Sequence, residues 1–152
     1  METIKNRLAV TLNKNRVFII KDEITKKDLV AKLVNAICDD TPEIDREDAL
    51  NAVLKREEGI STTLDTGLSI PHARWEDLNT FQAAVAVIPN SISDEYGLKI
   101  KVMYLFLSPA GPLFFPQHLK LLASLAERFK TPFIEELVAA KDEQEVLDKV
   151  SF

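Results

Sequence analysis

The chain contains two histidines, and the first, His72, ends a segment whose residue types suit the handling of phosphate. Arg56 and the hydroxyl pair Ser61 and Thr62 precede it. A neutral imidazole nitrogen can attack phosphorus, and its ordinary pKa of about 6.5 leaves much of the ring unprotonated at neutral pH. A guanidinium and hydroxyl groups can hold the phosphate oxygens. The segment therefore predicts that His72 carries a phosphoryl group covalently, without a separate cofactor.

These residues also have a purely structural interpretation. Arg56 falls in the last turn of a predicted helix, where the helix dipole favours any cation. A histidine after Ile-Pro is, as an isolated motif, more often structural than catalytic. Against this, Pro71 fixes its own φ and restricts Ile70 to an extended conformation, so that His72 leaves the strand end at a defined angle.

The second histidine, His118, opens a strongly amphipathic helix. In the structural interpretation it is a partly exposed residue at a helix start. In the functional one it donates a hydrogen bond to the phosphate on His72, and the helix N-terminus favours the anion. Leu113, Phe114 and Phe115 stand just before it. They form either a loop packed on the core or an apolar rim that docks a protein partner.

Other functions fit less well. A zinc site would be short of ligands, because the chain has two histidines and one cysteine, Cys38. A serine hydrolase is disfavoured, because no Gly-x-Ser-x-Gly motif occurs and Ser69 would point away from His72. The net charge of −5 argues against nucleic-acid binding. No long apolar run predicts a membrane span, and the start Met1–Arg7 lacks the apolar core of a signal peptide, which favours the cytoplasm.

The remaining sequence predicts one α/β domain over residues 1–152. In the helix after Thr25, Leu29, Leu33 and Ile37 form one apolar stripe, with Cys38 beside it as a small core residue. The expected elements are a strand at 17–20, a helix capped by Thr25, a helix from Asp45 to Gly59, strands at 81–88 and 100–107, a loop at 108–116, a helix at 117–129, a helix opened by Thr131-Pro132 and a helix capped by Asp142.

Four segments are distinctive when taken together: Arg56-Glu57, Ser61-Thr62, Gly67-Leu68-Ser69-Ile70-Pro71-His72-Ala73 and His118-Leu119-x-x-Leu122-x-x-Leu125-Ala126. They resemble a known family, the fructose/mannitol-type (type 2) IIA domain of the bacterial phosphoenolpyruvate-dependent sugar phosphotransferase system, which includes the nitrogen-regulatory IIA proteins. The resemblance runs from the Thr25 helix to the Asp142 helix. It implies a mixed β-sheet flanked by helices.

The resemblance also implies roles for the candidate residues. His72 would be the phosphoryl acceptor, His118 its stabilising neighbour and Arg56 the holder of phosphate oxygens, with Thr62 in support. The family takes its phosphate from the phosphohistidine of the small carrier HPr. Sugar-specific members pass it to a IIB protein, and regulatory members use it to change partners. The chain would thus be one component of a phosphotransferase rather than a stand-alone enzyme.

The sequence departs from the family pattern in the loop before His72. Thr63 and Asp65 stand where the family usually has glycines, and Ser69 stands where it has alanine. Losing glycines restricts φ and is expected to stiffen or reshape the loop, and Asp65 adds a negative charge near an incoming phosphate. The alternative function is therefore a regulatory protein-binding module of the same fold with weakened or lost phosphotransfer.

Overall fold

Two long antiparallel strands, β5 (Phe81–Ser93) and β6 (Lys99–Pro109), form the middle of the sheet in the computed structural model, which describes residues 10–59 and 61–151. The segment Met1–Arg7, from which the absence of a signal peptide was inferred, lies outside the described residues. The short strands β1 (Val10–Thr11) and β2 (Val17–Ile19) pair parallel with β5. On the other side, β3 (Leu68–Ser69) and β4 (His72–Trp75) pair parallel with β6. The sheet is therefore mixed, as expected.

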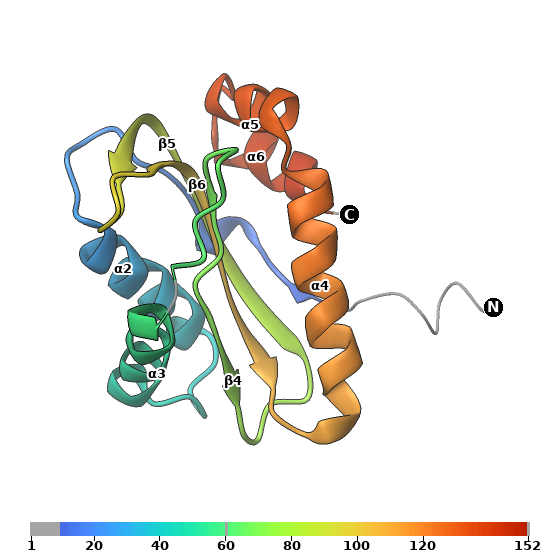
Figure 1. The fold of residues 1–152 in the computed structure, drawn as a ribbon. Coiled ribbons are helices and arrows are strands. Elements are labelled where there is room, and N and C mark those ends of the chain that lie inside the picture. The colour runs from blue at the N-terminus through green and yellow to red at the C-terminus, as the bar shows by residue number, and fades with distance from the viewer. Residues whose placement is uncertain (1–9, 60, 152) are drawn as a thin grey trace.

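Helices cover both faces of this sheet (Figure 1). On one face lie α2 (Lys26–Asp39) and α3 (Arg46–Gly59), and on the other lie α4 (Phe115–Arg128), α5 (Thr131–Val138) and α6 (Glu143–Val150). The chain also forms two short 3-10 helices, η1 (Lys14–Arg16) and η2 (Pro112–Phe114). The α/β prediction is confirmed. In the part of the chain that the structure describes, no helix is both long and apolar enough to cross a membrane.

The predicted helix starts on Thr25, Asp45 and Asp142 are confirmed. Thr25 Oγ1 accepts a hydrogen bond from Asp28 N at 3.0 Å, Asp45 Oδ2 accepts one from Asp48 N at 2.9 Å, and Asp142 Oδ1 accepts one from Glu145 N at 2.9 Å. Each side chain satisfies an amide that the first helical turn leaves without a backbone partner.

The two faces of the sheet carry two separate hydrophobic clusters. Successive residues of a strand point to opposite faces, so Ala84 and Ala86 pack under α2 and α3 whereas Ala83 and Val85 pack under α4 to α6. This two-sided burial explains why the strand sequences are apolar throughout. Leu29, Leu33, Ile37 and Cys38 lie in the cluster under α2, which confirms the predicted stripe and the buried cysteine.

Several predicted boundaries were wrong. The strand expected to end at residue 88 continues to Ser93, because after a register shift between Val87 and Ile92 it pairs with β6 again. The loop expected at 108–116 is shorter, since β6 runs to Pro109, η2 follows, and α4 begins at Phe115 rather than at residue 117. Lys130, not Thr131, occupies the cap position of α5, and it makes no side-chain cap bond.

Candidate functional site

His72 is the first residue of the edge strand β4. It lies opposite Phe106 of β6, and the two rings are stacked with centroids 5.0 Å apart. Pro71, which has no N–H to donate, accepts a hydrogen bond from Phe106 N at 3.1 Å and so keeps the edge in register. His72 is 3% exposed, and its Nδ1 lies 2.7 Å from the carbonyl oxygen of Ile70. Because a carbonyl can only accept, Nδ1 carries the proton, and Nε2 of the neutral ring keeps its lone pair.

His118 lies beside His72 in the first turn of α4. The two ring centroids are 5.3 Å apart and the planes are tilted by 59°. His118 is 5% exposed, so the interpretation of a partly exposed helix-start residue is wrong. Its Nδ1 is 2.7 Å from Oγ of Ser108, a fully buried residue of β6. The fold therefore brings together two histidines that are far apart in the sequence and fixes one nitrogen of each ring.

Both histidines are held in the neutral form. Burial lowers the pKa of His72 below its usual value, with a further contribution from the positive charge of Arg56, and together they outweigh the hydrogen bond to Ile70 and the charge of Glu57, which raise it. Burial also lowers the pKa of His118 to about 4, with added effects from the charges of His72, Arg74 and Arg56. Neutral rings are what a nitrogen nucleophile requires near pH 7.

Arg56 lies in the last turn of α3, and its side chain is exposed. The next residue, Glu57, is 7% exposed and holds the neighbouring loop. Its Oε2 accepts a hydrogen bond from Oγ1 of Thr62 at 2.8 Å, and its Oε1 lies 2.9 Å from Nζ of Lys26. Lys26 also pairs with Glu95 at 3.0 Å. Thr62 is thus fixed to Glu57 of α3, which is itself held by an ion pair with Lys26 of α2.

Ser61 is fixed by a different group, the carboxylate of Asp94 at the tip of the β5–β6 hairpin. Ser61 Oγ lies 3.0 Å from Asp94 Oδ2 and 3.1 Å from Oγ1 of Thr63. Burial raises the pKa of Asp94, but hydrogen bonds from Leu98 N, Tyr96 N and the two hydroxyls outweigh burial and hold that pKa below its usual range. Sequence reasoning missed Asp94, which comes 33 residues after Ser61.

The loop before His72 does not need glycines at the two positions where the family usually has them. Among the described residues other than glycine, only Asp77 and Ser91 have positive φ, so Thr63 and Asp65 adopt ordinary backbone conformations. Thr63 is buried and Asp65 is exposed. Gly67, by contrast, has φ of 101°, a conformation that strains other residues. The two substitutions therefore fit this loop without backbone strain.

Arg74 is a further cation at the site that sequence reasoning missed. It follows His72 by two residues on β4, so both side chains leave the same face of the sheet. Its Nη2 donates to the carbonyl oxygen of Gly111 at 3.0 Å, and its guanidinium lies 5.0 Å from the ring centre of Phe115. Phe115 in turn stacks on His118, with ring centroids 6.1 Å apart. The strand period of two was the signal that could have found it.

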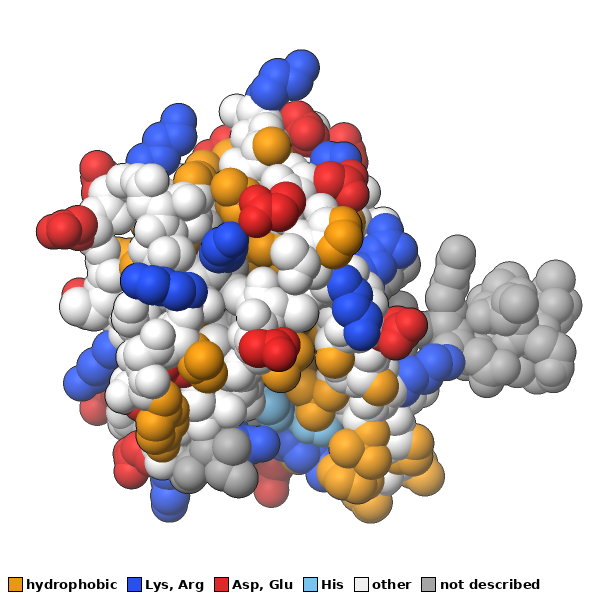
Figure 2. All heavy atoms as spheres, turned by 45° about the horizontal axis from the view of Figure 1, so that its top comes forward, with side chains coloured by type: hydrophobic (Ala, Val, Ile, Leu, Met, Phe, Trp, Pro, Cys, Tyr) orange, Lys and Arg blue, Asp and Glu red, His pale blue; other side chains and the backbone are white. Residues whose placement is uncertain are grey.

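An apolar rim surrounds this site. Leu113 is 89% exposed, Phe115 44% and Leu119 50%, whereas Phe114 is half-buried and packs against the core. Figure 2 shows histidine atoms in a hollow between Lys or Arg side chains and a group of hydrophobic side chains at the surface. The histidines are therefore reached from an apolar surface with positive charges beside it.

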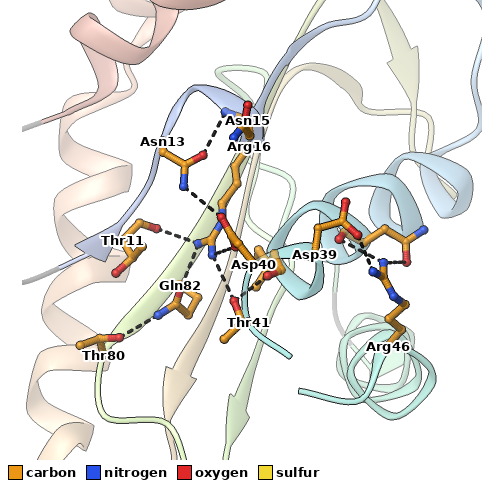
Figure 3. A network of polar contacts seen from close by, with 12 residues as sticks. Thr11, Asn13, Asn15, Arg16, Asp39, Asp40, Thr41, Arg46, Thr80 and Gln82 are labelled. Atoms are coloured by element: carbon orange, nitrogen blue, oxygen red, sulfur yellow. Dashed lines mark hydrogen bonds and ion pairs between the residues drawn. The ribbon is translucent and has the colours of Figure 1, made fainter. Parts of the chain in front are cut away.

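A second buried polar network lies around Arg16, which is 1% exposed (Figure 3). Its Nη1 donates to Gln82 Oε1 at 2.8 Å and to Thr11 O at 3.2 Å. Its Nη2 donates to Thr41 Oγ1 at 3.1 Å and forms an ion pair with Asp40. These contacts join β1, β5 and the end of α2, so the network stabilises the fold.

Comparison with known proteins agrees with this architecture. The family model described as phosphoenolpyruvate-dependent sugar phosphotransferase system, EIIA 2, matches residues 11–151. The chain belongs to this family. No curated protein matches the sequence.

Solved structures of EIIA 2 relatives share the fold at low sequence identity. The nitrogen regulatory protein IIA-Ntr from Neisseria meningitidis is 20% identical with a TM-score of 0.79, over 94% of this chain and 97% of that chain. IIA mannitol from Escherichia coli is 17% identical with a TM-score of 0.74, over 93% and 99%. The same mannitol enzyme in complex with phosphorylated enzyme IIB is 15% identical with a TM-score of 0.73, over 92% and 96%. These likenesses confirm the predicted fold.

Proposed function

We propose that this EIIA 2 chain is a phosphocarrier that accepts a phosphoryl group on Nε2 of His72. The observation that carries the proposal is the hydrogen bond between His72 Nδ1 and the carbonyl of Ile70 at 2.7 Å. It commits the proton to Nδ1 and leaves Nε2 as the nucleophile. Burial and the charge of Arg56 lower the pKa of His72, which keeps that lone pair available at neutral pH.

In the proposed reaction Nε2 of His72 attacks the phosphorus of a phosphohistidine on an HPr-like carrier. The Nε2–P bond forms while the donor P–N bond breaks, and the electron pair of that bond returns to the donor imidazole. The proton on Nδ1 stays on the ring and is held by the Ile70 carbonyl, so the phosphorylated ring is an imidazolium. When the P–N bond of this imidazolium later breaks, the electron pair returns to Nε2 and neutral imidazole leaves, which is a good leaving group and suits a residue that must pass its phosphate on.

The neighbouring groups stabilise the transferred phosphoryl group. Ser108 Oγ lies 2.7 Å from Nδ1 of His118. In the proposed reaction the hydroxyl donates to this nitrogen, so that Nε2 of His118 carries the ring proton and donates it to phosphate oxygen. Arg56 supplies positive charge. Thr62 donates its hydroxyl proton to the Glu57 carboxylate, and the hydroxyl of Ser61 is hydrogen-bonded to the Asp94 carboxylate. The main role of both hydroxyls is therefore to fix the conformation of the loop. The protein thus contributes positioning and charge stabilisation.

The partners follow from the surface around the histidines. Leu113 and Phe115 of the apolar rim, with half-buried Phe114 between them, dock the HPr-like carrier and then the acceptor, in the cytoplasm. A relative, IIA mannitol, forms a complex with phosphorylated IIB mannitol, and another relative is a nitrogen regulatory protein. The acceptor here is accordingly a IIB protein or a regulated target. The loop geometry favours the carrier over a module without phosphotransfer, because Thr63 and Asp65 introduce no positive-φ strain.

Intact-mass spectrometry tests the carrier function. The protein is incubated with phosphoenolpyruvate, the first enzyme of the system and HPr, alongside the variants His72→Ala and His118→Asn. We expect one acid-labile phosphoryl adduct on the wild type, none on His72→Ala, and a slower adduct on His118→Asn. An adduct of equal yield on His72→Ala, or none on the wild type, would overturn the proposal. Transfer of the label to a IIB protein would then separate sugar transport from regulation.

A further inference from the structure

Arg74 is a half-buried cation on β4, two residues after His72. Among the described residues, no Asp or Glu oxygen lies within 4.0 Å of its guanidinium. The same holds for Arg56 within the described chain. Glu57 is already paired with Lys26. Two neutral histidines are therefore flanked by two cations without counter-charges, which is an environment that favours an anion.

Arg74 lies on the same face of the sheet as His72. His72 and Arg74 lie opposite Phe106 and Ser108 of β6, on the face of the sheet that α4 covers. Ser108 touches His118, and Phe115, under the Arg74 guanidinium, stacks on His118. Arg74 thus shares a strand face with His72 and a ring neighbour, Phe115, with His118.

The present contacts of Arg74 leave much of its donor capacity unused. An arginine has five N–H donors. Nη2 donates to Gly111 O at 3.0 Å and makes a long contact of 3.4 Å with Pro109 O. Nε is buried and has no hydrogen-bond partner among the described residues. A buried guanidinium N–H without a partner is costly, so a ligand that could accept from it would be favoured.

We propose that Arg74 is a second phosphate-binding arginine, which turns from Gly111 and Phe115 toward the phosphoryl group when His72 becomes phosphorylated. This inference rests on the carrier function proposed above. A phosphoryl group has three oxygens that accept hydrogen bonds, and the single guanidinium of Arg56 leaves acceptor positions for a second arginine. The bond to Gly111 lies at the surface and is readily exchanged for charge-assisted bonds to phosphate oxygen.

The exchange also changes the apolar rim. When Arg74 leaves, the Gly111 carbonyl loses its donor and one face of Phe115 is uncovered. The phosphorylated and free forms then present different surfaces around the same histidine. The phosphate donor must bind the free form, and the acceptor must bind the phosphorylated form. The difference between the two surfaces would let each partner bind the form that it needs.

The test uses chemical phosphorylation, which needs no partner protein. Phosphoramidate phosphorylates histidine directly: Nε2 forms a bond to phosphorus, the P–N bond of the reagent breaks, and ammonia leaves. The ³¹P NMR signal of the phosphorylated protein is then followed against pH in the wild type and in Arg74→Gln, Arg74→Lys and Arg128→Gln. Arg128 is the matched control, because it is also stacked on a phenylalanine, 5.2 Å from the ring of Phe133, at the far end of α4.

A bound guanidinium favours the dianionic phosphoryl group, so Arg74→Gln should raise the titration midpoint by about one pH unit, or about tenfold in proton affinity. Arg74→Lys should raise it less, and Arg128→Gln should not change it. In the wild type, the Nε–H signal of Arg74 should shift on phosphorylation, a readout that requires no variant to fold.

An unchanged midpoint in Arg74→Gln, with an unshifted Arg74 Nε–H signal, would overturn the inference while leaving the carrier function intact. A wild type that gains no ³¹P signal would overturn both. A rise of the same size in Arg128→Gln would also count against Arg74, because the effect would then reflect net charge alone.

Discussion

The hydrogen bond between Ser108 and His118 gives a sharp test of how the site is held. Ser108 is fully buried and its Oγ lies 2.7 Å from His118 Nδ1. In Ser108→Ala this nitrogen keeps no partner, so the free energy of unfolding should fall by about 1–3 kcal/mol. The variant also loses control over which ring nitrogen carries the proton. A bond worth about 1.4 kcal/mol shifts the tautomer ratio about tenfold, so its loss lowers the fraction of His118 rings with the proton on Nε2 from about 90% to about 50%, and phosphorylation of His72 should slow about twofold.

Ser69→Ala is the matched control, since Ser69 is equally buried and its Oγ has no hydrogen-bond partner among the described residues. Removing an unpaired buried hydroxyl should leave the free energy of unfolding unchanged or raise it by about 1 kcal/mol. Urea unfolding can be followed by the fluorescence of Trp75, the only tryptophan in the chain. Equal loss of stability in both variants, or normal phosphorylation of Ser108→Ala, would refute the reasoning.

Three further predictions concern other groups. Burial and nearby positive charges lower the pKa of His118 to about 4. The unfolded chain therefore binds a proton that the folded chain does not between pH of about 6.5 and about 4, and the free energy of unfolding should fall over that window by up to about 3 kcal/mol in urea titrations. Asp94→Asn should slow phosphorylation several-fold, as measured by intact mass, because its carboxylate holds Ser61. Arg16→Met should lower the free energy of unfolding by about 2–4 kcal/mol in urea, because it leaves Asp40 and several buried acceptors without their donor.

Each of these has a control in the same chain. His118→Asn should flatten the pH dependence of stability, and an unchanged slope would assign it to other groups. In Asp94→Asn, the ¹H NMR titration of His72 should be nearly unaltered; a large shift would mean that Asp94 acts on the histidine itself. Arg46, paired with Asp39 at the surface, is the control for Arg16 (Figure 3). Arg46→Met should cost at most about 1 kcal/mol, and a loss equal to that of Arg16→Met would contradict the buried-network argument.

The helices and the central strands could be predicted because their signals are local. Thr25, Asp45 and Asp142 are caps with a bonding partner three residues ahead, and the apolar runs of β5 and β6 follow from burial on both faces. The edge strands β3 and β4 could not be predicted as two separate strands. They have two and four residues, on either side of Ile70-Pro71, and such short segments do not show the alternation of apolar and polar residues that marks a strand. They form because their backbones pair with the edge of β6, a long-range contact that the local sequence does not indicate.

Within the candidate site, sequence reasoning found the residues with distinctive chemistry and missed those that hold them. His72 and His118 stood out by type, and the structure brings their rings together. Ser108 and Asp94 gave no signal, because an ordinary serine and a turn aspartate acquire their partners only through long-range contacts. The roles of Arg56, Thr62 and Ser61 in holding phosphate stay predictions.

Because the histidine pair lies at the sheet edge between two helical layers, the candidate site forms only when both layers are folded. His72 sits on β4, Arg56 comes from the helical layer on one side of the sheet, and His118 comes from the layer on the other. Neither layer alone assembles the three groups. Under the proposed carrier function, a nascent or heat-damaged chain that has lost either layer would accept phosphate from a donor more slowly than the folded chain. The rate of phosphorylation would then report complete folding.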